Sequence, residues 1–155
     1  KGLPLNRAEV GDYVVNVECS GLPMLRMRRI ASTKTLAEIN QAIQAGKMQL
    51  TIPLVGFKQH PSKGVQGKIE KQILQQEDVD MENFRIEAVP EISLRGGLRA
   101  ATVPINNFLL EEISEDYANP SKHKSELSFA LHRGSYATIV LRELMKPRNP
   151  IKAGF

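Results

Sequence analysis

The sequence predicts an α+β chain in which mixed or antiparallel sheets are combined with helices. Three observations carry this prediction: residues 12–18 alternate with the period of a strand, residues 36–46 carry apolar side chains at helical spacing, and residues 126–145 run from strand to helix. With 155 residues and 41% hydrophobic content, the chain is long enough to bury a core. We therefore expect one ordinary domain or two small lobes.

The first strands are recognised by alternating side chains. Residues 12–18 place apolar side chains on one side of a two-residue period, which predicts a strand. Gly21 and Pro23 interrupt the pattern, and residues 24–30 alternate again, which predicts a second strand. One face of this second strand is basic, and it is either a surface for an anionic partner or a solvated sheet face. That face carries Met24, Arg26 and Arg28.

The clearest helix pattern follows Thr35. Thr35 and Glu38 have the spacing of a capping box, in which the two side chains satisfy free backbone N–H groups at the helix start. Gly46 is expected to stop the helix, because glycine readily adopts the left-handed conformation of a helix end. The apolar face of this helix is formed by Leu36, Ile39 and Ile43.

The middle of the chain alternates between strands, loops and one further helix. Residues 48–54 predict a strand, and Pro53 favours an edge position because proline has no N–H to donate. A glycine-containing loop is expected over residues 56–67, followed by a helix of about three turns to Gln76. Apolar residues at helical spacing in this helix are Val65, Ile69 and Ile73, and its expected exposed cations are Lys68 and Lys71.

A turn and a short strand precede the best internal boundary. Gly96 and Gly97 predict a tight turn between the cations Arg95 and Arg99. Residues 98–103 predict a strand that Pro104 ends, and we expect the boundary at residues 104–107.

The last third predicts a strand, a turn and a helix. Residues 126–132 alternate between apolar and polar side chains, and Gly134 and Ser135 break that pattern. Ser135 is expected to be the N-cap of the following helix, because serine side chains accept hydrogen bonds from free N–H groups there. Pro147 is expected to end the helix.

The charge distribution mildly favours a polyanionic partner. The net charge is +4, from 21 Lys and Arg against 17 Asp and Glu, and the basic excess is concentrated in residues 122–152. An acidic stretch at residues 111–116 precedes this basic end and is expected to form a solvated loop or strand edge. Cys19 has no partner for an internal disulfide, and no apolar run is long enough to span a membrane. We expect a cytoplasmic protein without membrane contact, and the start at Lys1 instead of methionine suggests a fragment.

Several common site chemistries are not predicted. The three histidines and Cys19 are scattered without the close pairing of a zinc site, so no metal is expected. The glycines near Lys68 lack the spacing of a phosphate-binding loop, and no nucleophile motif is visible. None of the four aspartates lies in a context that marks it as buried and paired; they are Asp12, Asp78, Asp80 and Asp116. No catalytic group is predicted within these residues.

Residues 127–145, LSFALHRGSYATIVLRELM, resemble the C-terminal signature of the TruD family of pseudouridine synthases. The family pattern is an apolar strand, a Gly-Ser-aromatic-Ala-Thr turn and a helix bearing Leu-Arg-Glu. Two further stretches are similar to the archaeal and eukaryotic branch, LPLNRAEVGDYV at residues 3–14 and RGGLRAATV at residues 95–103.

The resemblance implies that this chain is the C-terminal part of such an enzyme. Residues 1–104 would belong to the inserted domain peculiar to the family, and residues 105–155 would supply the C-terminal strand and helix of the catalytic domain. The family's Gly-x-Lys-Asp motif is absent, and no Lys-Asp pair occurs here. The catalytic aspartate is therefore expected upstream of Lys1, and the isolated chain is expected to be inactive.

The resemblance also implies a reaction and a binding site. Such enzymes isomerise uridine to pseudouridine in tRNA, here of the pseudouridine-13 type, with an aspartate and neither metal nor other cofactor. The family's aromatic residue at the position of Tyr136 lies against the uracil. Tyr136 is therefore the first candidate for substrate binding, with an ordinary aromatic packed on Phe129 as the alternative. The turn around it adds Gly134, Ser135 and Arg133, where Arg133 is either a phosphate contact or a solvated cation, while Arg142 is expected in a buried pair with a carboxylate.

Two other functions remain open. The chain is either part of a synthase or a non-catalytic RNA-binding module in which the basic strand, Lys68, Lys71 and the basic tail follow phosphates. A small metabolic or structural subunit without nucleic acid is the third possibility. No oligomeric state follows from the sequence.

Overall fold

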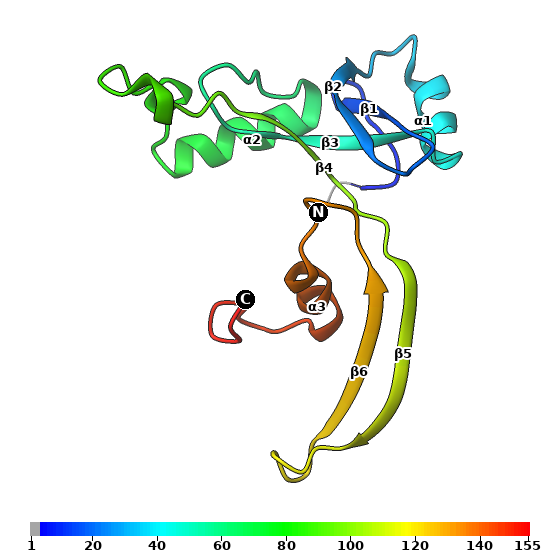
Figure 1. Cartoon of the computed structure of the whole chain (residues 1–155). Coiled ribbons are helices and arrows are strands. Elements are labelled where there is room, and N and C mark those ends of the chain that lie inside the picture. Colours follow the sequence, from blue (N-terminus) through cyan, green and yellow to red (C-terminus); the bar gives the residue numbers. More distant parts are fainter. Residues whose placement is uncertain (1–3) are drawn as a thin grey trace. The chain divides into compact units, whose positions relative to one another are not determined.

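The computed structural model describes residues 4–155, which form two compact units that divide between Thr102 and Val103 (Figure 1). Leu3, at the start of the LPLNRAEVGDYV stretch, lies outside the described residues. Both units combine antiparallel strands with helices, which confirms the predicted α+β class. Each unit has its own secondary structure.

The first unit is built on a four-stranded antiparallel sheet with the order β2-β1-β3-β4. The strands are β1 (Tyr13–Val17), β2 (Pro23–Ile30), β3 (Met48–Leu54) and β4 (Gly97–Ala100). The first three lie where alternation predicts them. The fourth is shorter than predicted: it begins at Gly97 and ends at Ala100 rather than Val103, although the Ala101 N–H still donates to the Leu50 carbonyl at 2.9 Å.

The main core lies on one face of this sheet, against helix α1 (Leu36–Gln44). Val14 of β1 and Ile39 of α1 are both fully buried there. The other buried members of this core are Ala8, Ala31, Met48 and Leu50. A smaller buried cluster of Tyr13, Val15 and Leu98 occupies the opposite face, as expected from the two-residue period of β1.

The helix that follows Thr35 is confirmed, but the predicted capping box is wrong. The Thr35 side chain does not cap the helix; its Oγ1 instead accepts a hydrogen bond from the Ser32 N–H at 3.1 Å. The hydroxyls of Ser32 and Thr35 are also within 2.9 Å. Thr35 therefore closes the turn before the helix, and Glu38 forms an ion pair with Arg29 at 3.8 Å. Gly46 follows the helix end with a positive φ of 69°, as predicted for a stop.

The predicted edge position of β3 is wrong, and the pairing around Pro53 explains how an inner strand accommodates a proline. β3 is an inner strand, but its registered pairs with β1 end at Thr51, while its pairs with β4 run from Thr51 to Leu54. Pro53 therefore lies where β3 pairs with one neighbour, opposite Leu98. An inner strand tolerates proline at such a position because the missing N–H removes no bond to the second neighbour.

Beyond β3, a loop leads into helix α2 (Gly64–Gln76), three residues before the end of the predicted loop. Lys68 and Lys71 are exposed on it, as predicted. Its apolar residues Val65, Ile69 and Ile73 are also exposed. Two short 3-10 helices, Met81–Phe84 and Pro90–Ile92, follow α2 and were not predicted.

The second unit consists of a long hairpin and one helix. β5 (Asn106–Glu115) pairs with β6 (His123–Ala130) in a two-stranded antiparallel sheet, and α3 (Ala137–Met145) follows. The acidic stretch lies mainly in β5, which is exposed along its whole length. The predicted strand over residues 126–132 starts earlier and ends at Ala130. α3 ends at Met145, two residues before Pro147, as predicted.

Within residues 4–155, no helix is both long enough and apolar enough to cross a membrane. The same described residues contain no cluster of three His, Cys, Asp or Glu side chains suited to a metal ion.

Candidate functional site

The four predicted substrate-binding residues form the turn between β6 and α3. Gly134 has a φ of +88°, and a Cβ on it would meet nothing within 4 Å, so glycine is needed there for its backbone conformation rather than for space. The Ser135 N–H donates to the His132 carbonyl at 3.1 Å and closes the turn. The chain therefore reverses at Arg133 and Gly134, and Ser135 leads to Tyr136 at the start of α3.

Tyr136, not Ser135, is the N-cap residue, so the predicted cap is wrong. Because Ser135 is still part of the turn, the helix begins one residue later than predicted. Tyr136 has an extended backbone, and the Ile139 N–H donates to its carbonyl at 3.1 Å. No side chain caps the helix start. This backbone arrangement leaves 57% of Tyr136 exposed.

The exposure of Tyr136 is what a stacking residue requires. A ring buried among aliphatic side chains offers no face to a base, whereas the Tyr136 side chain is accessible within its unit. Phe129, the predicted packing partner in the alternative interpretation, stacks on Phe108 with ring centroids 6.4 Å apart and an angle of 19° between the planes. Arg133 is exposed on the same turn, and Ser135 is half-buried.

Arg142 does not form the predicted buried pair. It lies 3.8 Å from Glu143, and both side chains are substantially exposed. Glu143 also accepts a hydrogen bond from Lys146 at 2.6 Å. That hydrogen bond is the main reason why the pKa of Glu143 is lowered from its ordinary value. These charged groups form an exposed cluster at the end of α3.

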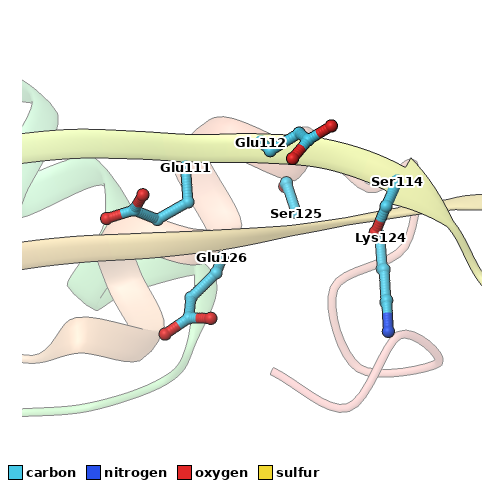
Figure 2. A pocket seen from close by; sticks show the side chains of 6 residues that line it. All are labelled: Glu111, Glu112, Ser114, Lys124, Ser125 and Glu126. Atoms are coloured by element: carbon cyan, nitrogen blue, oxygen red, sulfur yellow. The ribbon is translucent and has the colours of Figure 1, made fainter.

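A hollow beside the hairpin is a poor candidate for an anionic substrate. Figure 2 shows side chains of β5 and β6 along it, with Glu111 and Glu126 extending from neighbouring strands. Three carboxylates and one lysine line it, and an excess of negative charge repels phosphate. The lining residues are Glu111, Glu112, Ser114, Lys124, Ser125 and Glu126.

The first unit contains a contact that the sequence does not reveal. Arg28 of β2 lies over the ring of Tyr13, 5.9 Å from its centroid, and donates to the Gln59 side chain at 3.1 Å. Arg28 belongs to the predicted basic strand, but Gln59 lies 31 residues further on, in the loop before α2. No local pattern links the two residues, because the loop reaches β2 only through the tertiary fold.

Nearly the whole chain is similar to known proteins of one family. The family model described as tRNA pseudouridine synthase D (TruD) matches residues 1–144. A protein of Methanosarcina acetivorans, described as a probable tRNA pseudouridine synthase D, is 39% identical over 145 residues, which cover 94% of this chain and 32% of the relative. A Methanosarcina mazei relative with the same description is 38% identical over 97% of this chain and 34% of its own length.

A solved structure is also similar. The crystal structure of a protein from Methanosarcina mazei, described as a putative tRNA pseudouridine synthase D (TruD), has a TM-score of 0.81 and 37% identity, covering 97% of this chain and 34% of that one. The chain thus spans about a third of the length of the relatives that it matches. Both the sequence and the fold lead to the same conclusion: this chain belongs to the TruD family of tRNA pseudouridine synthases.

Proposed function

We propose that the gene product carrying this chain isomerises uridine to pseudouridine in tRNA, and that this chain supplies part of the uracil-binding site. The family membership supports the reaction class, and the exposed Tyr136 at the turn before α3 is the observation that supports the site. The catalytic aspartate would come from a different part of the gene product, since the sequence of this chain contains no Lys-Asp pair.

Tyr136 would hold the base while its bond to the ribose is broken and remade. A target uridine must leave its stack before reaction, which costs a few kcal/mol that contacts in the pocket have to offset. Stacking on an aromatic ring contributes about 1–3 kcal/mol per base and leaves the base free to turn in its plane. Arg133 would contact a phosphate of the flipped nucleotide, and Gly134 and Ser135 would set the turn that presents the ring.

We assign the two units to the two domains expected of the family. The unit up to Thr102 would be part of the inserted domain, and residues from Val103 on would complete the catalytic domain, with a cytoplasmic location for the whole protein. The hairpin supports this assignment, because β5 is exposed throughout and Val140 is the buried hydrophobic residue of the second unit. A two-stranded sheet of this kind is marginal alone and gains stability by pairing within a larger sheet.

The test is a pair of tyrosine substitutions in the complete gene product. We expect Tyr136→Ala to slow pseudouridine formation in a tRNA transcript by about 5- to 150-fold, which is the loss of one stacking contact. Tyr136→Phe keeps the ring and should retain most of the activity. Tyr117→Ala, at an 87% exposed tyrosine in the same unit, is the matched control and should react at the normal rate. Normal turnover by Tyr136→Ala would remove the proposed role.

The second candidate function is a non-catalytic RNA-binding module, favoured by the exposed cations Lys68 and Lys71 on α2. Binding of tRNA by the complete gene product without any pseudouridine formation would select this alternative. Formation of pseudouridine would exclude it.

A further inference from the structure

We infer that Arg28 is a preorganised contact for an RNA phosphate, and that the face of β2 and the loop before α2 position the tRNA substrate of the proposed function. The inference rests on that function for its ligand and on the first unit alone for its geometry.

Arg28 is held by two neutral groups. Its guanidinium lies over the Tyr13 ring at 5.9 Å and donates to Gln59 Oε1 at 3.1 Å. Both partners are buried, with 4% of each residue exposed, whereas Arg28 itself is exposed. A guanidinium has five N–H donors and a fixed planar shape, so one hydrogen bond and one cation–π contact orient it without using its remaining donors.

The charge of Arg28 is not compensated by the described part of the chain. Within residues 4–155 no carboxylate forms an ion pair with it. Arg29, the next residue, pairs with Glu38 at 3.8 Å. Arg28 lies opposite Val15 and Arg29 opposite Val14, so the two side chains lie on opposite faces of the sheet. One arginine thus serves an internal ion pair, while the other keeps its charge for a ligand.

The loop that carries Gln59 is fixed to the sheet by close backbone packing. A Cβ on Gly56 would overlap the backbone of Gly96, and a Cβ on Gly96 would overlap Gln59. The Gln59 side chain further donates to the His60 carbonyl at 2.8 Å. These contacts hold Gln59 in one position and place the exposed residues Lys58 and His60 directly beside the residue that binds Arg28.

The chemistry of this surface fits a phosphate backbone. Arginine donates in a fork that matches two phosphate oxygens, and charge-assisted bonds of this kind are the strong ones. The lysine beside Gln59 adds positive charge, and a phosphate chain offers successive anionic groups to such a surface. Contacts of this type fix the register of an RNA without reading its sequence.

The experiment measures tRNA binding by the complete gene product as a function of salt. We expect Arg28→Gln to weaken binding of an unmodified tRNA transcript by about tenfold and to reduce the slope of log affinity against log salt by about one. Arg29→Gln is the matched control, because it removes a neighbouring cation that is already ion-paired; it should leave the slope unchanged. Arg28→Lys keeps the charge and should keep most of the slope.

The outcomes separate this inference from the proposed function. An unchanged slope in Arg28→Gln, while the wild type forms pseudouridine, overturns the phosphate contact alone. A smaller slope in Arg28→Gln than in the wild type, where the wild type forms no pseudouridine, supports the phosphate contact and overturns the proposed reaction. A lower melting temperature of Arg28→Gln with unchanged tRNA affinity means that the contacts of Arg28 with Gln59 and Tyr13 serve the stability of the fold alone, and also overturns the inference.

Discussion

The side-chain amide of Asn40 pairs with both backbone groups of Ala8. Asn40 Oδ1 accepts from the Ala8 N–H at 2.7 Å, and Asn40 Nδ2 donates to the Ala8 carbonyl at 3.2 Å. Ala8 belongs to the main core, and the pair ties the segment before β1 to helix α1. Both backbone groups of the buried Ala8 therefore have the hydrogen-bond partners that buried polar groups require.

We expect Asn40→Ala to destabilise the first unit by about 1–3 kcal/mol, because both backbone groups of the buried Ala8 lose their partner. The midpoint of urea denaturation measures the change. Gln41→Ala, at the exposed neighbouring position of α1, is the control and should stay within about 0.5 kcal/mol of the wild type. Equal midpoints for the two variants would show that the Asn40 contacts do not stabilise the fold.

Gly56 is expected to tolerate no side chain. A Cβ there would overlap the backbone of Arg95 and Gly96, which are themselves fixed by the start of β4. Overpacking of this kind costs about 1–3 kcal/mol, so Gly56→Ala should lower the melting temperature. Gly97→Ala is the matched control, since a Cβ at Gly97 meets nothing within 4 Å and should be accepted. A melting temperature of Gly56→Ala equal to that of the wild type would contradict the close packing of the loop.

The sequence predicts the strands and helices well because their periods are local. β1, β2, α1 and α3 all occur where alternation or helical spacing indicates them. The errors lie in the partners predicted for individual residues. Thr35 has the spacing of a capping box but binds Ser32, and Pro53 indicates an edge although β3 has a neighbour on each side. At Pro53 the pairing of β3 with two neighbours overrides the local pattern, whereas Thr35 binds a residue three positions earlier, so only the error at Pro53 has a tertiary cause.

The functional residues also differ in how far the sequence predicts them. The turn at Gly134 and Tyr136 is a contiguous motif, so a resemblance in sequence is enough to locate it. The contact between Arg28 and Gln59 joins residues 31 positions apart and depends on how the loop before α2 folds onto the sheet. No sequence motif around Arg28 or Gln59 predicts that the two side chains are in contact.

Asp12 is expected to make the first unit less stable as the pH rises. The sequence does not single this residue out, but burial raises the pKa of Asp12 above its ordinary value of 3.8, and the carboxylates of Glu9 and Glu70 act in the same direction. A hydrogen bond from the Glu9 N–H at 2.8 Å opposes them. Because the folded state binds the proton more tightly than the unfolded state, the contribution is present below pH 3.8 and is lost as the pH rises through the raised pKa.

Asp12→Asn tests this sign, since the amide keeps an acceptor for the Glu9 N–H and does not ionise. We expect the variant to gain stability relative to the wild type as the pH is raised from below 3.8 towards neutrality. Urea denaturation at a series of pH values measures the difference. Glu87→Gln, at an exposed position, corrects for the loss of one negative charge. A constant difference between Asp12→Asn and wild type across this range would rule out the raised pKa.

The turn at the tip of the hairpin is expected to depend on pH in the opposite sense. Asp116 accepts hydrogen bonds from the Asn119 side chain at 2.7 Å and from the Ala118 N–H at 3.0 Å. The bond from Asn119 is the main reason why the pKa of Asp116 is lowered from its ordinary value of 3.8. The unfolded state then binds the proton more tightly, so these contacts stabilise the turn above pH 3.8 and are lost as the pH falls through the lowered pKa.

Asn119→Ala removes the largest of these causes and should move the pKa of Asp116 back towards 3.8. A carbon-13 NMR titration of the Asp116 carboxyl group measures the shift directly. Lys122→Gln is the comparison, because the charge of Lys122 contributes least among the effects that lower this pKa, and it should cause a smaller change. A larger change in Lys122→Gln than in Asn119→Ala would mean that long-range charge, not the hydrogen bond within the turn, controls the ionisation of Asp116.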